Sequence, residues 1–279
     1  MRLITYRDRG VFRAGVLVDD GVVDAAAALG ESRPLGVRQL FVPGRLDELA
    51  GAIARGNQEP LVVQLEVPVP DPEKIICIGL NYRSHAEEAG LDPPASPTIF
   101  GKYRNALAAP VAAVSLPEAS NKVDYEAEVA VVVGRRCSSV TEDEALDAVA
   151  GYTLLNDLSA RDLQFATPQW MAGKVFDGSA PCGPALVTPD EAGPHDSISF
   201  ALDLNGERMQ EASTDDLIFS VPELISHLST LMTLEPGDLI STGTPSGVGS
   251  TRDPKVWLKP GDEILISSPT LGELRTTIA

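Results

Sequence analysis

The segment DYEAEVAVVVG, residues 124–134, decides how this chain folds. Side chains on an extended segment alternate between two faces, so Asp124, Glu126 and Glu128 would share one face. The strand itself is predicted over 126–133. The other face begins with Tyr125 and continues with alanine and valine. Both faces become apolar toward the end of the segment, which predicts a strand that is buried on both sides.

Two carboxylates of like charge, about 7 Å apart along such a strand, are costly to bury unless a cation compensates them. Glu126 and Glu128 therefore suggest a cation with oxygen ligands, such as Mg²⁺, Mn²⁺ or Ca²⁺. An exposed strand end with solvated acids is the alternative on the pattern alone. Asp157 ends the apolar stretch 151–156, where it would be a third ligand or an N-cap of the next segment.

His85 differs from the other two histidines in its neighbours. His195 lies in a stretch that predicts a loop, and His227 lies in a predicted apolar helix. In a helical turn after the predicted strand 75–78, His85 and Glu88 would be i, i+3 neighbours. The carboxylate would then orient the imidazole as a general base, unless the two form only an incidental surface ion pair.

The charge balance limits the partners that the protein can bind. The 279 residues carry 22 Lys+Arg against 40 Asp+Glu, a formal net charge of -18. Such a chain repels phosphate backbones and anionic lipid surfaces, which argues against nucleic-acid and membrane binding. A small anionic substrate would need local attraction from a metal ion or a few cations.

The sequence shows no apolar run near the roughly 20 residues that span a bilayer, and its N-terminus lacks the features of a signal peptide. The three cysteines, Cys77, Cys137 and Cys182, are scattered. They fit reduced thiols better than a disulfide framework. We therefore expect a cytoplasmic protein.

The chain divides at a run of prolines. Pro68, Pro70 and Pro72 each remove a backbone donor and disfavour helix, which predicts an extended linker. We place a boundary there, with a small N-terminal α/β domain at 1–68 and a second domain at 69–279. The first would hold strands at 2–6, 12–18 and 21–24 and a helix at 45–55.

The second domain has the pattern of a strand-rich α+β fold rather than a βαβ succession. Thr141 and Glu144 form a capping box that predicts a helix to about Val149. A second helix is predicted over 222–231, with proline in its first turn. Two Pro-Gly-Asp turns, at 236–238 and 260–262, each introduce an apolar strand.

Six motifs occur together in one order, and that order resembles the fumarylacetoacetate hydrolase family. The resemblance covers about residues 75–279 and implies that family's strand-rich fold, usually as a homodimer. The motifs are IGLNYxxHxxE (78–88), FxK (100–102), DYEAEVAVVVG (124–134), GYTLLNDLSARDLQ (151–164), GKxFD (173–177) and TGTPxGVG (242–249).

The resemblance also implies roles for particular residues. Mg²⁺ or Mn²⁺, or Ca²⁺ in some members, would be held by three acids. A catalytic dyad would lie on a short lid, and a lysine would stabilise developing negative charge. These residues are Glu126, Glu128 and Asp157 for the metal, His85, Glu88 and Lys174 for catalysis, and Arg161, Gln164, Gly243 and Thr244 for substrate binding.

Without the resemblance, several of these residues have plainer interpretations. Lys174 would be a surface lysine in a glycine-rich turn, and Lys102 and Arg104 would also be surface residues. Arg161 would pair with Asp157 or Asp162. The 242–249 loop, whose glycines permit close backbone approach, would meet either a ligand or other parts of the protein.

The family uses one enolate-stabilising site for several reactions. The preferred expectation is a metal-dependent hydrolase that cleaves a carbon–carbon bond in a 2,4-dioxo acid of the acylpyruvate or fumarylpyruvate type. Oxaloacetate decarboxylation and 2-hydroxyhepta-2,4-diene-1,7-dioate-type isomerisation are the alternatives, and a non-catalytic keto-acid binding protein is a more remote one. The stretch 165–171 is expected to determine specificity.

Overall fold

The computed structural model describes all residues from Met1 to Ala279. Strands dominate and most helices are short, so the predicted strand-rich α+β class is confirmed. The strands are β1 (Arg2–Asp8), β2 (Val11–Val18), β3 (Gly21–Asp24), β4 (Leu65–Glu66), β5 (Ile75–Gly79), β6 (Thr98–Lys102), β7 (Leu107–Ala108), β8 (Val111–Val114), β9 (Val123–Asp124), β10 (Ala127–Val133), β11 (Val149–Asn156), β12 (Ser159–Ala160), β13 (Ala180–Val187), β14 (Ser199–Leu204), β15 (Glu207–Ser213), β16 (Leu239–Ser241), β17 (Glu263–Ser268) and β18 (Gly272–Ile278).

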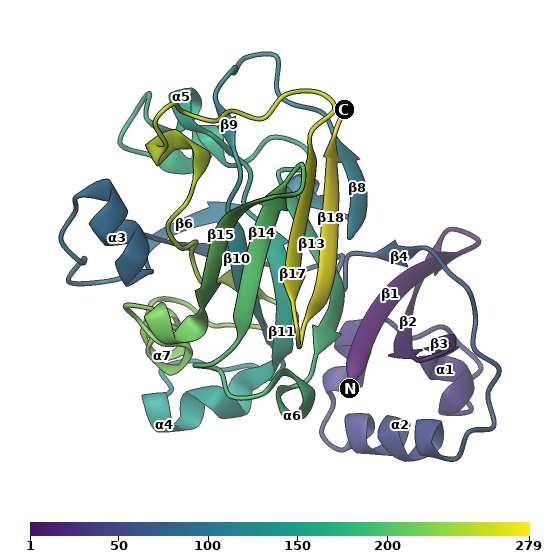
Figure 1. Cartoon of the computed structure of the whole chain (residues 1–279). Coiled ribbons are helices and arrows are strands. Elements are labelled where there is room, and N and C mark those ends of the chain that lie inside the picture. The colour runs from purple at the N-terminus through teal and green to yellow at the C-terminus, as the bar shows by residue number, and fades with distance from the viewer.

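The helices lie between these strands, mainly at the ends of the sheets (Figure 1). The α-helices are α1 (Ala25–Ala28), α2 (Arg45–Ala54), α3 (Arg83–Ala89), α4 (Glu142–Ala145), α5 (Arg161–Gln164), α6 (Pro189–Ala192) and α7 (Val221–Leu231). The 3₁₀ turns are η1 (Val37–Phe41), η2 (Arg104–Ala106), η3 (Leu146–Ala148), η4 (Trp170–Gly173), η5 (Thr214–Asp216) and η6 (Gly249–Thr251).

Two large sheets form the body of the protein. The larger has the strand order β3-β2-β1-β13-β11-β10-β16-β5-β6, with β4 beside β1 and β7 beside β13. The smaller has the order β15-β14-β17-β18-β8 and lies in front of β10, β11 and β13 in Figure 1. One hydrophobic cluster contains buried residues of both sheets, so the two sheets share a core.

Strand β10 lies at the centre of the larger sheet, and all its residues are buried, as the sequence predicts. Its two faces pack into different clusters. Val129 and Val131 belong to the core shared with the smaller sheet. Ala130 and Val132, which share a face with Glu128, pack on the other side of the sheet.

The pairing around β10 brings distant parts of the chain to one place. Strand β11 runs antiparallel to β10, so Glu128 lies opposite Leu155 and the start of β10 adjoins Asp157. Strand β16 is also antiparallel to β10, and the 242–249 loop leaves it beside the acidic end of β10. Strand β5 is parallel to β16 and leads into α3.

The N-terminal elements form a lobe at the side of the molecule (Figure 1). The predicted strands and the helix from Arg45 are present. Strand β1 pairs with β13, so the larger sheet runs through this lobe into the rest of the protein. Residues 67–74 have no regular secondary structure. The boundary between 68 and 69 stays a prediction.

The helix predictions are confirmed in part. Helix α7 begins with a capping box between Ser220 and Glu223 and ends at Leu231, close to its predicted bounds. The capping box of Thr141 and Glu144 is also present. However, a single helix to Val149 is wrong, because α4 ends at Ala145, η3 follows it, and β11 takes over at Val149.

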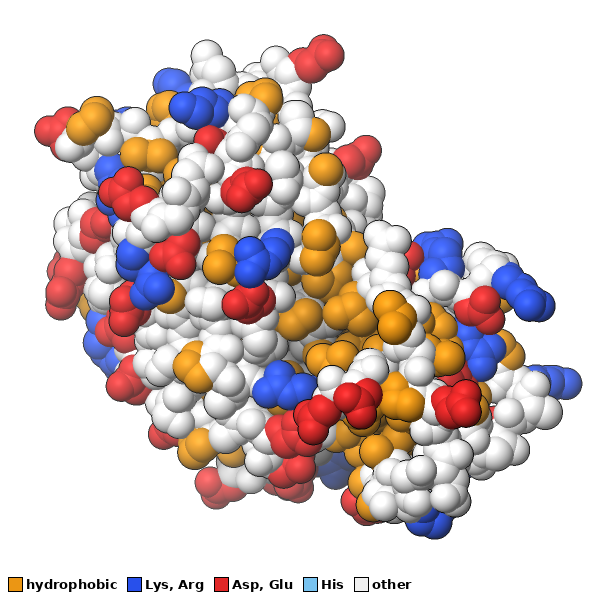
Figure 2. Space-filling model, turned by 45° about the vertical axis from the view of Figure 1, so that its right-hand side comes forward, with side chains coloured by type: hydrophobic (Ala, Val, Ile, Leu, Met, Phe, Trp, Pro, Cys, Tyr) orange, Lys and Arg blue, Asp and Glu red, His pale blue; other side chains and the backbone are white.

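Hydrophobic side chains gather on the face where the N-terminal lobe adjoins the two sheets (Figure 2). The predicted homodimer would need an apolar surface of this kind, but it stays a prediction, as does the cytoplasmic location. None of the helices combines the length and apolar character needed to cross a membrane.

Candidate metal and substrate site

Three buried carboxylates meet where β10 begins and β11 ends. Glu126, Glu128 and Asp157 each offer an oxygen atom, and these atoms lie within 4.8 Å of one another. The antiparallel register explains the meeting, since the Asp157 N–H donates to the Glu126 carbonyl at 2.9 Å. Asp157 does not cap a helix, because α5 begins only after Ala160. The interpretation as solvated acids at an exposed strand end is wrong.

Two buried lysines lie against these acids. Lys174 Nζ is 2.6 Å from Glu126 Oε2 and 2.7 Å from Asp157 Oδ2. Lys102 Nζ is 2.6 Å from Asp157 Oδ1 and also donates to the Lys174 carbonyl. The prediction that Lys102 is a surface residue is wrong, because its side chain is fully buried. Surface placement is also wrong for Lys174.

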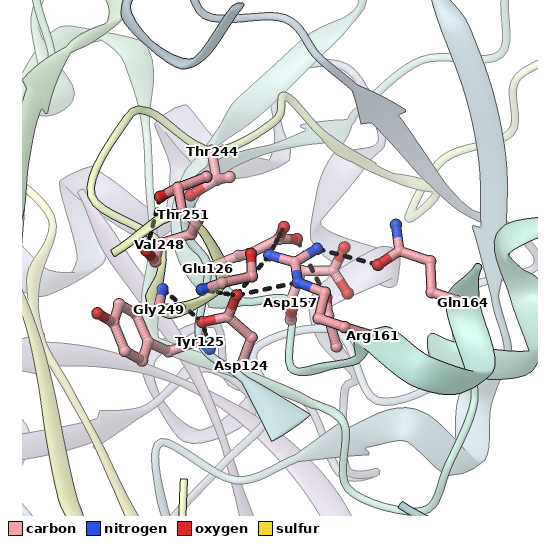
Figure 3. Close-up of polar contacts among 12 residues, drawn as sticks. Asp124, Tyr125, Glu126, Asp157, Arg161, Gln164, Thr244, Val248, Gly249 and Thr251 are labelled. Atoms are coloured by element: carbon pink, nitrogen blue, oxygen red, sulfur yellow. Dashed lines mark hydrogen bonds and ion pairs between the residues drawn. The ribbon is translucent and has the colours of Figure 1, made fainter. Parts of the chain in front are cut away.

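Arg161 enters the same cluster from the start of α5. Its Nε and Nη2 each lie 2.9 Å from Asp124 Oδ2, and Nη2 lies 2.7 Å from Glu126 Oε1 (Figure 3). Its Nη1 donates to Gln164 Oε1 at 3.0 Å. The expected pairing with Asp157 or Asp162 is therefore wrong. The guanidinium is planar and forked, so it can lie between two carboxylates and still face a ligand.

The acids differ in how their charge is balanced. Burial favours the neutral form of Glu126, but the charges of Arg161 and Lys174 outweigh it and lower the pKa. For Glu128, burial and the charges of Asp157 and Glu126 raise the pKa to about 8. Its hydrogen-bond partners are the Ser241 hydroxyl and the Gly243 N–H, and no cation lies within ion-pair distance.

This donor set fits a divalent cation. Carboxylate oxygens are the ligands that Mg²⁺ and Mn²⁺ prefer. Four acids, counting Asp124, face three cations in the cluster, and the unbalanced acid is Glu128. A bound cation would supply the missing charge. Glu126, Glu128 and Asp157 can therefore hold a divalent metal.

The 242–249 loop packs on the protein with its glycines. At Gly247, φ is +98° and an added Cβ would lie 2.1 Å from the Met209 carbonyl oxygen. An added Cβ at Gly249 would lie 2.1 Å from the Val256 carbonyl oxygen. The close approach is therefore to the protein's own backbone, which supports the structural interpretation of these glycines.

The predicted dyad lies on α3. His85 Nδ1 is 3.5 Å from Glu88 Oε2, which is long for a hydrogen bond. Glu88 also accepts the Gly247 N–H, at 3.0 and 3.1 Å to its two oxygens. Although burial acts in the opposite direction, the neighbouring His85 imidazole and the bond from the Gly247 N–H lower the pKa of Glu88. The surroundings therefore favour an ionised Glu88 carboxylate beside the His85 imidazole.

A cavity of about 460 Å³ joins α3 to the carboxylate cluster. Of the residues predicted for the site, Glu88, Asp157 and Gly243 do not line it, and Gly243 contacts Glu128 instead. Two residues of the stretch expected to set specificity, Phe165 and Trp170, do line it. The predicted site residues in the wall are His85, Glu126, Glu128, Arg161, Gln164, Lys174 and Thr244.

Some residues of the site were not singled out from the sequence. The sequence indicates Asp124 only as a member of the acidic strand face, and Lys102 only as part of a motif and as a surface residue. Gln210 was missed altogether. Its buried amide donates to Thr244 Oγ1 at 2.9 Å and accepts the Ala127 N–H at 2.9 Å. No local signal marks Gln210, because its partners lie far away in the sequence.

Comparisons with known proteins support the resemblance. The family model described as fumarylacetoacetate (FAA) hydrolase C-terminal matches residues 74–279. Oxaloacetate tautomerase fahd2, mitochondrial, from Xenopus laevis is 36% identical, with 100% of this chain and 90% of that protein covered. A 2,4-didehydro-3-deoxy-L-rhamnonate hydrolase from Sphingomonas sp. (strain SKA58) is 39% identical, over 100% of this chain and 96% of that protein.

A solved structure agrees over the whole length. The fumarylacetoacetate hydrolase from the psychrophile Exiguobacterium antarcticum superimposes with a TM-score of 0.85 at 31% identity, covering 100% of this chain and 99% of that one. Its match includes the N-terminal lobe, which the family model omits. The chain belongs to the fumarylacetoacetate hydrolase family, whose members are enzymes.

Proposed function

We propose that this protein is a metal-dependent hydrolase that cleaves a carbon–carbon bond in a small 2,4-dioxo acid of the acylpyruvate or fumarylpyruvate type. The observation that carries the proposal is the single cavity that joins His85 to Glu126 and Glu128, whose carboxylate oxygens meet that of Asp157. A base and a cation site would then act on the same bound molecule.

The two ends of the cavity carry different groups: cations and carboxylates line one end, and the His85 imidazole lines the other. Lys174 and Arg161 line the end that holds the carboxylates, and they would attract the anionic 2-oxo acid group. Lys174 carries three N–H donors, of which two point to Glu126 and Asp157, so one remains for substrate. A Mg²⁺ or Mn²⁺ ion on the three carboxylates would add Lewis-acid stabilisation of negative charge.

The residues of α3 would carry the proton transfer. Glu88, anchored by the Gly247 N–H, would orient His85, and His85 would take a proton from water. The water oxygen would add to the C4 carbonyl and the C3–C4 bond would break, with its electron pair passing to the 2-oxo fragment. That enolate would be stabilised by Lys174, and return of the proton to C3 would give one carboxylic acid and one 2-oxo acid.

A second candidate is a tautomerase of 2-oxo dicarboxylates, since the Xenopus laevis relative is named for that activity on oxaloacetate. This reaction moves a proton between oxygen and carbon and breaks no carbon–carbon bond. The same base and the same enolate-stabilising end of the cavity would serve it. It needs no bound water, so the two candidates differ in products rather than in machinery.

The test is turnover of acetylpyruvate, fumarylpyruvate and oxaloacetate with Mg²⁺ or Mn²⁺, and again after EDTA. Metal-dependent release of pyruvate from the acylpyruvates is the expected result. Metal-dependent decay of the enol absorbance of oxaloacetate, without pyruvate from the acylpyruvates, would favour the tautomerase. Release of CO₂ from oxaloacetate would indicate a decarboxylase. Binding of these acids without any turnover would overturn both candidates.

A further inference from the structure

Asp124 is a fourth carboxylate beside the cavity, and none of the roles proposed above uses it. Its side chain is fully buried, yet it is not one of the three acids whose oxygens meet at the metal site. Burying a carboxylate is costly unless donors surround it. The identity of its donors therefore indicates what it holds in place.

Five donor contacts converge on this carboxylate. Oδ1 accepts the Tyr125 N–H at 3.0 Å and the Gly249 N–H at 2.7 Å. Oδ2 accepts the Ser250 N–H at 3.0 Å, and Arg161 Nε and Nη2 each lie 2.9 Å from it. Figure 3 shows Asp124 between the guanidinium and the 248–251 turn. One side chain thus joins two elements that are far apart in the sequence.

The first element is the cation beside the metal ligands. The Arg161 Nη2 that lies next to Asp124 is also 2.7 Å from Glu126 Oε1. Because two nitrogens of the fork are fixed by Asp124, the plane of the guanidinium is fixed as well. Without that restraint, Arg161 could turn fully onto Glu126 and compete with a metal ion for its oxygens.

The second element is the loop that supports the dyad. Gly249 packs so closely that an added Cβ would lie 2.8 Å from Asp124 Oδ1. Two residues earlier, the Gly247 N–H donates to Glu88. Asp124 therefore sets the position of the loop, and the loop sets the carboxylate that faces His85.

We propose that Asp124 is a positioning residue that aligns both halves of the site from one buried carboxylate. It orients Arg161 beside Glu126, and through the 247–250 loop it orients Glu88 beside His85. This proposal rests on the proposed function for the meaning of the two halves. Its structural part, the control of the loop and of α3, is independent of which reaction the protein performs.

The experiment compares Asp124→Asn with Asp238→Asn. Asp238 is a matched control because it is also fully buried, accepts the Lys74 and Glu235 N–H groups, and pairs with Lys74 Nζ at 2.8 Å. It is not part of the cavity wall. In Asp124→Asn, the N–H groups of the new amide would face the N–H donors that now surround the carboxylate. Arg161 would keep only Glu126 as an anionic partner.

Three quantities are measured on the full chain: Mn²⁺ affinity by calorimetry, amide hydrogen exchange, and turnover. We expect Asp124→Asn to weaken Mn²⁺ binding by about 10–100-fold, the range for residues that support metal ligands. We also expect faster exchange at 247–251 and at 83–89 in the metal-free protein, and at least a tenfold loss of kcat. Asp238→Asn should lower thermal stability without these changes.

The outcomes separate this proposal from the proposed function. Unchanged exchange at 247–251 and 83–89 together with unchanged Mn²⁺ affinity in Asp124→Asn would overturn it. If the wild type turned over none of the substrates but the exchange pattern still changed as expected, the positioning role would stand and the proposed function would fail. If Asp124→Asn does not fold, Gly249→Ala is measured instead: its Cβ would lie 2.1 Å from the Val256 carbonyl oxygen and 2.8 Å from Asp124 Oδ1, so the loop must shift from both. Unchanged exchange at 83–89 in that variant would overturn the control of α3 by the loop.

Discussion

Charged side chains reach the cavity from two regions with different surroundings. In the cluster around Glu126, the ion-paired side chains are at most 8% exposed, and the N–O contacts among them are 2.9 Å or shorter. On α3, His85 and Glu88 are 16% and 26% exposed, and their contact is 3.5 Å long. The cluster is held from several strands, whereas the dyad is held by one short helix.

The difference suggests that the two regions have separate roles. Charges that are fixed before a ligand arrives need no reorganisation when negative charge develops, which suits a metal and enolate site. A short helix with one buried residue, Ala86, belongs to the part of a protein that opens first. Changes in the cluster should therefore alter metal affinity, and changes on α3 should alter turnover alone.

The largest effect is expected from Glu128→Gln. Glu128 has no cation partner of its own, and burial together with the charges of Asp157 and Glu126 raises its pKa to about 8. In the metal-free protein near neutral pH the amide therefore replaces a largely protonated acid of the same shape. We expect the metal-free variant to be at least as stable to heat as the wild type. We also expect it to lose Mn²⁺ affinity by at least about 100-fold, beyond the effect of supporting residues, and to lose turnover. Calorimetric titration and thermal unfolding after EDTA measure these quantities.

Glu126→Gln is the comparison for that variant. Glu126 balances Arg161 and Lys174, so its loss leaves buried cations without a partner. This variant should lose both metal affinity and stability. Equal stability of the two metal-free variants would show that the charge balance of the cluster is not as described, and wild-type metal affinity in either would remove that residue from the ligand set.

The sequence predicted those parts of the fold that depend on local pattern. The pattern in 126–133 predicts a strand buried on both faces, the amphipathic pattern predicts α2, and proline in the first turn marks the start of α7. The pairing of β1 with β13 could not be predicted, because strand order depends on contacts between residues nearly 200 positions apart. For the same reason, the boundary predicted at the prolines does not indicate that the larger sheet contains strands from both sides of it.

The site shows the same limit. Acid spacing along one strand pointed to Glu126 and Glu128, because a two-residue period is visible in the sequence. The burial of Lys102 could not be read in this way, since its partner Asp157 lies 55 positions later. Proximity in sequence predicts Asp157 or Asp162 as the partner of Arg161, whereas the actual pairing with Asp124 follows from the contact of β9 with β12.

The second-largest effect is expected on α3. His85→Ala should lower kcat by about 10²–10⁴-fold, the usual contribution of a general base, and should leave Mn²⁺ affinity within about threefold of the wild type, because His85 forms no ion pair with the cluster. Glu87→Ala is the control, since Glu87 is exposed on the same turn and outside the cavity wall. Loss of metal affinity in His85→Ala would contradict the separation of the two regions.

The smallest effect should come from the attachment of α3 to the rest of the protein. Ser84 Oγ donates to Asp216 Oδ2 at 2.6 Å, and the Ser84 N–H donates to the same oxygen at 3.1 Å. Ser84→Ala removes the first bond and the longer one, 3.4 Å, that Ser84 Oγ accepts from the Ser246 N–H, a loss of about 1 kcal/mol. That corresponds to roughly a fivefold shift toward an open helix. We expect kcat/KM to fall by about that factor and amide exchange at 83–89 to quicken, with Mn²⁺ affinity unchanged.

Ser220→Ala is a matched control for that measurement, because Ser220 Oγ donates to Glu223 Oε2 at 2.6 Å at the start of α7, outside the cavity wall. It should cost similar stability and leave kcat/KM alone. If Ser84→Ala changed metal affinity as much as kcat/KM, α3 and the cluster would move together. The loop between Gly247 and Ser250 would then transmit motion in both directions, rather than holding Glu88 against a fixed Asp124.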